Sequence, residues 1–122
     1  MDDIIFKFTR SDAINDGVLV DVTNTAKEAG LRFPVALTRA VWCLYVEVPP
    51  GVECQDEPGR LWDIVWMLRC AIHSAARNGC EILFRLHVRN DNRRPKFVTL
   101  KAVCGAGDDL EPVITVMLPD ED

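Results

Sequence analysis

A change in hydrophobic period at Gly79 constrains the fold of this chain more than any other feature. Before this glycine, apolar residues recur every three or four positions from Leu61 to Ala75, which predicts a helix over about residues 60–78 with one wide apolar face. After it the period becomes two, and three alternating segments separated by two turns extend to residue 118. This pattern is typical of an antiparallel meander with one buried face. The predicted inward residues are Ile82, Phe84, Leu86, Val98, Leu100, Ala102, Ile114, Val116 and Leu118.

The long helix needs an apolar surface to cover, and the meander supplies one. We therefore predict an α+β fold, with helices on one face of a small, mostly antiparallel sheet and a C-terminal three-stranded meander over about 81–118. Shorter elements are predicted upstream. Three short helices are predicted: one at 12–16, one that is capped by Thr23 or Asn24 and ends at Gly30, and one that is capped by Thr38 and extends from Arg39 to about Val46. Extended segments are predicted at 18–22 and 31–37. No linker divides the 122 residues, so residues 1–122 are predicted to form a single domain.

Composition and charge exclude several classes of protein. Apolar residues make up 48% of the chain, enough for one core, and the longest apolar run, Ala40–Val46, is too short to span a bilayer. The acidic start at Met1–Asp3 does not resemble a signal peptide. Five cysteines without a CxxC pair predict reduced thiols rather than a zinc site, and hence a cytoplasmic protein. A net charge of -5 argues against a generic DNA-binding protein.

A second stripe on the predicted helix holds Trp62, Trp66, Arg69 and His73, at spacings of four, three and four. These residues could line an aromatic and cationic groove for a ligand. Alternatively, both rings pack beneath the long loop of residues 49–59, with Arg69 lying over Trp66 and pairing with an acid. We predict the second arrangement, in which each tryptophan-to-alanine change would cost about 3–5 kcal/mol.

The charged residues of the C-terminal half fall into two blocks of opposite sign. The basic block comprises Arg85, Arg89, Arg93, Arg94, Lys96 and Lys101, and the acidic block comprises Asp108, Asp109, Glu111, Asp120, Glu121 and Asp122. The two blocks could pair with one another or could steer binding partners. If the turn predicted at 105–109 and the C-terminal tail meet at one end of the sheet, the six acids form a compact negative patch that fits a basic surface on a partner protein.

Strand alternation places Arg85, His87, Arg89, Thr99 and Lys101 on the sheet face opposite the helix. A flat cationic face is typical of proteins that bind single-stranded nucleic acid, but these proteins also need several aromatic stacking platforms. Only Phe97 could serve as one here, so nucleic-acid binding is the weaker prediction. An acidic partner would fit this face as well.

Catalytic motifs do not stand out, and no catalytic residue, metal site or cofactor is assigned. The chain lacks GxSxG, HExxH and a phosphate-binding GxxxxGK[ST] motif. Asp108, Asp109 and Glu111 could bind a divalent cation, since hard cations prefer clustered oxygen ligands. Aspartates that follow glycines also cap hairpin turns by bonding their own backbone, and this structural role is favoured.

Four ordered blocks resemble one family: DGVLVDVT (16–23), EAGLRFPVALTRAVW (28–42), DEPGRLWDIVWMLR (56–69) and GAGDDLEPVITVMLPDED (105–122). It is a family of small bacterial proteins of unknown function, often carried by phages, plasmids and integrated elements. The resemblance extends over nearly the whole chain. It implies a stand-alone accessory protein of mobile DNA, and it assigns no site residue.

Three functions from different classes follow, of which the first is favoured. The first is a small, acidic, non-enzymatic accessory protein of a mobile element that binds a host protein with a basic surface, for example in a CRISPR-type defence complex. The second is a nucleic-acid-binding accessory protein that uses the Arg85/His87/Arg89 face. The third is a divalent-metal-dependent enzyme with a site near Asp108, Asp109 and His87. None of the three involves a membrane.

Overall fold

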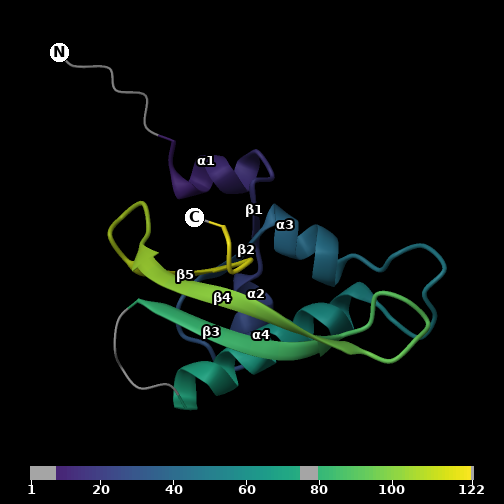
Figure 1. The fold of residues 1–122 in the computed structure, drawn as a ribbon. Helices are drawn as coiled ribbons and strands as arrows, with labels where there is room; N and C mark the ends of the chain where they lie inside the picture. Colours follow the sequence, from purple (N-terminus) through teal and green to yellow (C-terminus); the bar gives the residue numbers. More distant parts are fainter. Residues whose placement is uncertain (1–7, 75–79, 122) are drawn as a thin grey trace.

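The computed structural model describes residues 8–74 and 80–121, which form an α+β fold (Figure 1). This confirms the predicted fold class. In chain order the elements are α1 (Arg10–Asn15), β1 (Leu19–Asp21), α2 (Thr23–Glu28), β2 (Val35–Thr38), α3 (Arg39–Val41), the π-helical segment η1 (Trp42–Val46), α4 (Glu57–Ser74), β3 (Glu81–Val88), β4 (Lys96–Ala106) and β5 (Pro112–Met117). Within the described residues no helix is both long enough and apolar enough to cross a membrane.

The strands form one sheet in the order β1-β2-β5-β4-β3. The last three strands make the predicted antiparallel meander, in which Phe84 lies opposite Leu100 and Ala102 opposite Val116. The two short upstream strands enlarge this meander. β2 pairs in parallel with β5, and β1 pairs antiparallel with β2. The result is a five-stranded, mostly antiparallel sheet.

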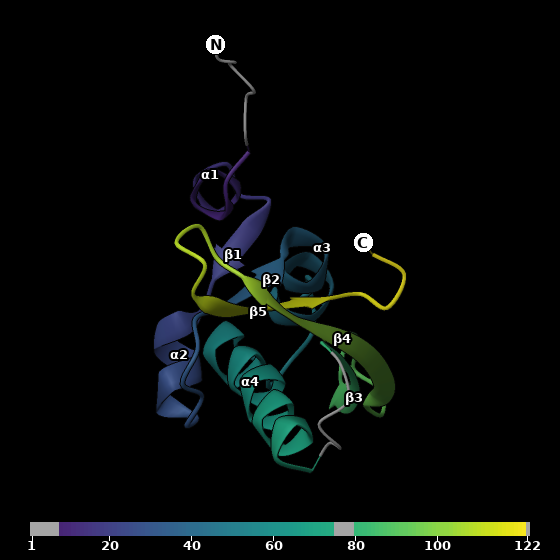
Figure 2. The ribbon, with the colours of Figure 1, turned by 90° about the vertical axis from the view of Figure 1, so that its left-hand side faces the viewer.

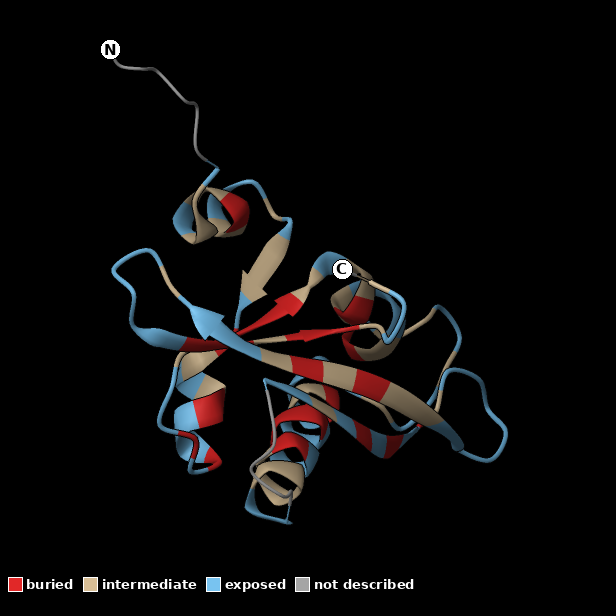
Figure 3. Ribbon diagram, turned by 60° about the vertical axis from the view of Figure 1, so that its left-hand side comes forward, coloured by how far each residue is buried: buried red, intermediate tan, exposed pale blue. Residues whose placement is uncertain are grey.

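Helices α2 and α4 lie on the same face of the sheet (Figure 2). The core between helix and sheet contains Ile64, Val65 and Leu68 of α4, all fully buried, and buried residues of the strands line the other side of it (Figure 3). Six of the nine predicted inward residues are buried, and Ile82, Val98 and Leu118 are half-buried.

The helix boundaries differ from the predicted ones where a cap lies elsewhere. α4 begins at Glu57 rather than Arg60, because the Asp56 carboxylate accepts a hydrogen bond from the Gly59 N–H at 2.6 Å and caps the first turn. The last predicted positions of this helix, 75–78, lie outside the described residues.

The caps of the shorter helices confirm one prediction and correct another. Thr38 caps α3 as predicted, its hydroxyl accepting from the Val41 N–H at 3.3 Å. α2 follows Val22, which makes no side-chain cap. Thr23, predicted as a possible cap, lies inside α2, and its hydroxyl bonds to Asp21 and to the backbone of Val35. At α1 the capping residue is Thr9, which forms a reciprocal capping box with Asp12.

Candidate functional site

The predicted acidic patch is divided between two places. Asp108, Asp109 and Glu111 lie in the β4–β5 turn, whereas Asp120 and Glu121 follow β5, and Asp122 lies outside the described residues. The six residues of β5 separate the two groups by about 20 Å of extended chain. Figure 2 shows the turn and the C-terminal segment on opposite sides of the molecule. The condition for one compact negative patch, that turn and tail meet, is therefore not fulfilled.

Several of these acids form hydrogen bonds within the chain. The Asp108 carboxylate accepts from the backbone N–H groups of Arg10 and Ser11, at 2.8 and 3.0 Å, and so caps the first turn of α1. The Glu121 carboxylate accepts from the Thr38 hydroxyl at 2.8 Å and from the Leu118 N–H at 2.7 Å. These contacts give both acids a role in the fold.

The turn acids lie near Arg10 rather than near the basic block. The Arg10 guanidinium donates to the Thr115 hydroxyl at 2.7 Å and to the Ile114 carbonyl at 2.9 Å. Burial lowers the pKa of Arg10, while the charges of Asp21, Asp108 and Glu111 act in the opposite direction. Arg10, which lies outside both charge blocks, is thus a partner of the acidic turn.

The cluster expected for a metal-dependent enzyme does not assemble. His87 lies opposite Phe97 near the start of β4, whereas Asp108 and Asp109 follow the other end of this eleven-residue strand. Among residues 8–74 and 80–121, no group of three or more His, Cys, Asp and Glu side chains could hold a metal ion. The prediction that the aspartates cap this turn is wrong: Asp108 bonds to α1, and the Glu111 carboxylate accepts from the Asp109 N–H at 3.1 Å instead.

Half of the predicted basic face is engaged by the chain itself. Lys101 donates to the Glu121 carbonyl at 2.7 Å. Arg89 donates to the carbonyls of Glu53 at 2.7 Å and Arg93 at 3.1 Å, which ties the loop before α4 to the β3–β4 turn. Arg85 and His87 are exposed on the face as predicted. The usable part of the face therefore lies on β3.

The two tryptophans of α4 are not core residues. Trp62 and Trp66 are 37% and 41% exposed, and their rings stack on one another with centroids 5.9 Å apart. The prediction that they pack beneath the loop is wrong. The predicted position of Arg69 is confirmed, because its guanidinium lies 5.0 Å from the centroid of the Trp66 ring.

Strand β3 forms one edge of the sheet, and β4 is its only neighbouring strand within the described residues. The Cys104 N–H donates to the Cys80 carbonyl at 2.8 Å, so even-numbered positions of β3 direct their backbone groups toward β4. The N–H and C=O groups of Glu81, Leu83, Arg85 and His87 consequently point outward. An edge of this length is a template for pairing with another chain.

Aromatic and apolar side chains flank this edge on both sides. A hollow of about 380 Å³ runs beside it, lined by Asp63, Trp66, Met67, Arg85, Leu86, His87 and Phe97. The rings of His87 and Phe97 stack with centroids 4.1 Å apart, and Phe97 and Leu83 are each 64% exposed. Burial raises the pKa of Asp63. We define the β3-edge surface as Trp62, Asp63, Trp66, Met67, Leu83, Arg85, His87 and Phe97.

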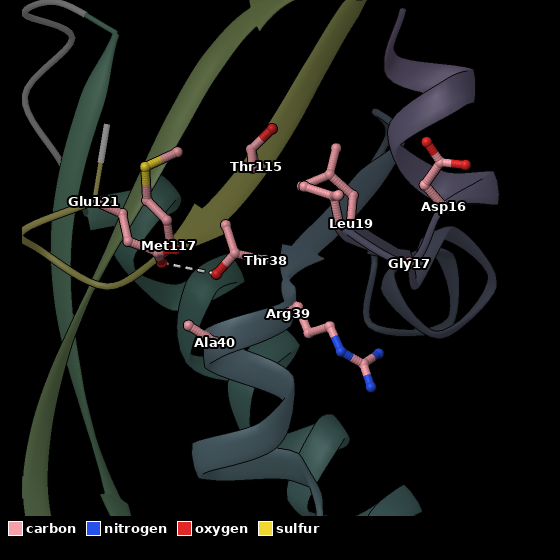
Figure 4. Close-up of a pocket in the computed structure, with 10 residues that line it drawn as sticks. Asp16, Gly17, Leu19, Thr38, Arg39, Ala40, Thr115, Met117 and Glu121 are labelled. Carbon is pink, nitrogen blue, oxygen red and sulfur yellow. Dashed lines mark hydrogen bonds between the residues drawn. The ribbon is translucent and has the colours of Figure 1, made fainter. Parts of the chain in front are cut away.

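A second hollow, of about 440 Å³, lies between the α1–β1 turn and the C-terminal segment (Figure 4). Leu19, Ala40 and Met117 contribute apolar lining, and the hydrogen bond between Thr38 and Glu121 lies within it. Thr38 and Glu121 thus bond to each other, and their contact holds the C-terminal segment against the end of β2. We therefore assign these residues a structural role.

A model of a family of unknown function, DUF6573, matches residues 1–122. The chain belongs to the DUF6573 family. No curated protein and no solved structure matches it. In this DUF6573 protein the β3-edge surface is the candidate functional site, because exposed rings, an exposed cation and outward-facing strand backbone groups meet there.

Sequence reasoning missed Asp63, Met67 and Leu83 as members of this surface. A signal for Leu83 was present, since it is an apolar residue at an outward position of an alternating strand. The tryptophans carried a signal too, because Trp62 and Trp66 lie beside, rather than within, the apolar stripe of their helix.

Proposed function

We propose that this DUF6573 protein is a non-enzymatic binding protein that takes up an extended segment of a partner protein as a further strand beside β3. One observation carries the proposal: an eight-residue edge strand whose outward backbone groups are flanked by exposed aromatic residues. Natural proteins usually protect such edges with charges, bulges or proline. Here the edge carries the charges of Glu81 and Arg85, but the aromatic rings of Trp66 and Phe97 line the hollow beside it.

Strand addition would use both parts of this surface. The backbone groups of Leu83, Arg85 and His87 supply main-chain hydrogen bonds, which give affinity without sequence preference. Side chains of the added strand alternate between the two sheet faces. One set would contact Leu83 and Phe97 on the outer face, and the other set would contact the α4 side of the hollow. Burying one large apolar side chain contributes about 1.5–3 kcal/mol.

The charges of the surface indicate the chemistry of the partner. Arg85 and His87 lie on the outer face, whereas Asp63 lies on the α4 side of the same hollow. The partner segment that fits carries acidic side chains toward the outer face. The sequence predicted a partner with a basic surface, on the condition that the acidic residues form one patch. Because these residues lie in two separate places, the structure no longer favours that partner. The cellular context we propose is the one implied by the resemblance: an accessory protein of a mobile element that binds a host protein, for example in a CRISPR-type defence complex.

A proline at position 85 tests the strand-addition step. Arg85→Pro removes an outward N–H while leaving the β3–β4 ladder its donors. Arg85→Ala is the matched control, because it removes the same side chain and keeps the N–H. A photo-crosslinking amino acid at Phe97 reports contact with the partner in a lysate of the organism from which the sequence comes, and one at Leu110, 83% exposed in the β4–β5 turn, serves as the positional control.

We expect the probe at Phe97 to crosslink one protein through an extended segment after nuclease treatment. Arg85→Pro should lose this crosslink by at least tenfold relative to Arg85→Ala, with both variants folded by circular dichroism. Equal crosslinking from Leu110, or undiminished crosslinking by Arg85→Pro, would contradict the proposal.

The same hollow favours single-stranded nucleic acid as a second candidate ligand. The sequence offered Phe97 alone as a stacking platform, whereas the structure places Trp66 and His87 with it around Arg85. Base stacking on such rings contributes about 1–3 kcal/mol per base. Fluorescence anisotropy with a labelled oligothymidylate tests this candidate. Binding that weakens with salt and is lost in Trp66→Ala would favour it over a protein partner.

A further inference from the structure

Cys80 and Cys104 face one another at the base of the β3–β4 hairpin. Glu81 pairs with Val103, so the next pair along the ladder is Cys80 with Cys104, and the Cys104 N–H donates to the Cys80 carbonyl at 2.8 Å. Directly opposite residues direct their side chains to the same face of the sheet. In a hydrogen-bonded pair the Cα atoms lie about 5.5 Å apart, which is within the range of about 4.4–6.8 Å that disulfides span. The Cβ atoms of such a pair, up to about 5.5 Å apart, must move closer to reach the roughly 3.5–4.5 Å of a disulfide, and the resulting strain makes the bond easier to reduce.

Both thiols are accessible to a reagent in solution. Cys80 and Cys104 are exposed, and neither is in a disulfide. Within the described part of the chain, no third His, Cys, Asp or Glu side chain joins them in a group that could hold a metal. Two facing thiols without further ligands suit oxidation better than closed, four-ligand metal coordination.

We propose that Cys80 and Cys104 form a reversible dithiol–disulfide pair that cross-links the base of the β3–β4 hairpin. The oxidant is a small disulfide such as glutathione disulfide. One cysteine thiolate attacks a sulfur of this disulfide and releases one glutathione thiolate. The second cysteine thiolate attacks the mixed disulfide at the protein sulfur and releases the other. The protein loses two electrons and two protons, and glutathione disulfide becomes two glutathione thiols.

The other cysteines provide an internal comparison. Cys43, Cys54 and Cys70 lie on η1, on the loop before α4 and on α4, whereas Cys80 directly precedes β3 and Cys104 lies opposite it on β4. Cys43 and Cys54 are exposed, as Cys80 and Cys104 are. Exposure alone would therefore oxidise all four to a similar extent. Strand register selects Cys80 and Cys104.

The Cys80–Cys104 disulfide should raise the stability of the protein and should be readily reduced. A bond between positions 80 and 104 closes a loop of 25 residues, counted from 80 to 104 inclusive. Closing a loop of this size restricts the unfolded chain and raises Tm, by roughly 5 °C or more. An exposed disulfide is also more easily reduced than a buried structural one. The inference does not depend on the proposed function, although β3 is the strand that both involve.

The full-length protein equilibrated with glutathione disulfide tests the inference directly. We expect the loss of two hydrogen atoms in the intact mass. A non-reduced tryptic digest should join residues 78–85 to residues 102–122, and excess reductant should reverse the link. Cys80→Ser and Cys104→Ser should each abolish the linked peptide and the rise in Tm. Cys54→Ser, the matched control, should retain both.

Two results would overturn the inference. One is single glutathionylation of Cys80 or Cys104 without a linked peptide, because the second thiol would then be out of reach. The other is a set of links that includes Cys43 or Cys54 as often as the predicted pair, because exposure rather than register would then decide the reaction. All these residues are at the surface, so the serine variants are expected to fold.

Discussion

Replacing Arg60 with methionine should destabilise the protein strongly, because this side chain holds distant parts of the fold together. Arg60 is 5% exposed, and its guanidinium links three segments, two of which are distant from it in sequence. Its Nε donates to the Val46 carbonyl at 3.1 Å, and its two terminal nitrogens donate to the Arg89 carbonyl at 2.7 Å, to Gln55 at 3.3 Å and to Asn90 at 2.5 Å. The side chain therefore joins the end of η1, the loop before α4 and the end of β3.

The size of the effect follows from these contacts. Burial lowers the pKa of Arg60, so part of what its hydrogen bonds contribute is offset by the loss of hydration. Methionine preserves most of the volume, but it leaves the carbonyls of Val46 and Arg89 without their donor. Each unsatisfied buried carbonyl costs about 1–3 kcal/mol. We expect a loss of about 2–5 kcal/mol in the free energy of unfolding, and a fall in Tm of roughly 10 °C or more.

Urea denaturation followed by circular dichroism measures this loss. The midpoint should fall while the slope with urea concentration stays constant, because the folded state keeps its compactness. Arg60→Lys is the matched control for charge. Lysine retains the positive charge but lacks the planar fork that reaches several acceptors, so it should not restore stability. A wild-type midpoint for Arg60→Met, or full recovery by Arg60→Lys, would refute the reasoning.

Three smaller predictions concern the surface and the caps. Trp62→Ala and Trp66→Ala should each cost about 1 kcal/mol or less, since the rings are largely outside the core; a loss of about 3–5 kcal/mol in urea denaturation would mean that they are core residues after all. Asp63 has a pKa raised by burial, so its native state binds protons more tightly than the unfolded chain and stability falls as pH rises through that interval. Asp63→Asn should therefore stabilise the protein at pH 7 and have no such effect at pH values below the unfolded pKa of about 3.9, as Tm measured across pH would show. Asp108→Ala should cost about 1 kcal/mol by leaving the N–H groups of Arg10 and Ser11 without their acceptor, although the Thr9–Asp12 capping box stays, and hydrogen exchange should quicken in residues 10–15; unchanged exchange there would contradict this role of Asp108.

Elements with local signals could be predicted from the amino-acid pattern without any structure. The three- and four-residue spacing of Leu61, Ile64, Val65 and Leu68 predicts α4, and alternation after Gly79 predicts the meander. Side chains return to the same face about every 3.6 residues in a helix and every two residues in a strand. These patterns can therefore be recognised without knowledge of distant contacts. The separation of the acidic residues was available in the same way, because β5 itself holds the turn and the tail apart.

The parallel pairing of β2 with β5 could not be predicted from the sequence and is seen only in the tertiary structure. Val35 lies beside Ile114, and no periodicity within either segment specifies a neighbour so distant along the chain. This pairing places β2 and β1 beyond β5 and leaves β3 at the opposite edge of the sheet.

The burial of Trp62, Trp66 and Arg60 also depends on tertiary contacts that the local sequence does not specify. The sheet ends at β3, so the tryptophan stripe of α4 meets the edge of the sheet rather than its face, and both rings stay exposed. Arg60, a residue type that usually lies at the surface, becomes buried because three segments converge on it with carbonyl and amide acceptors. Burial depends on what packs against a side chain, and for these residues the packing partners come from distant parts of the chain.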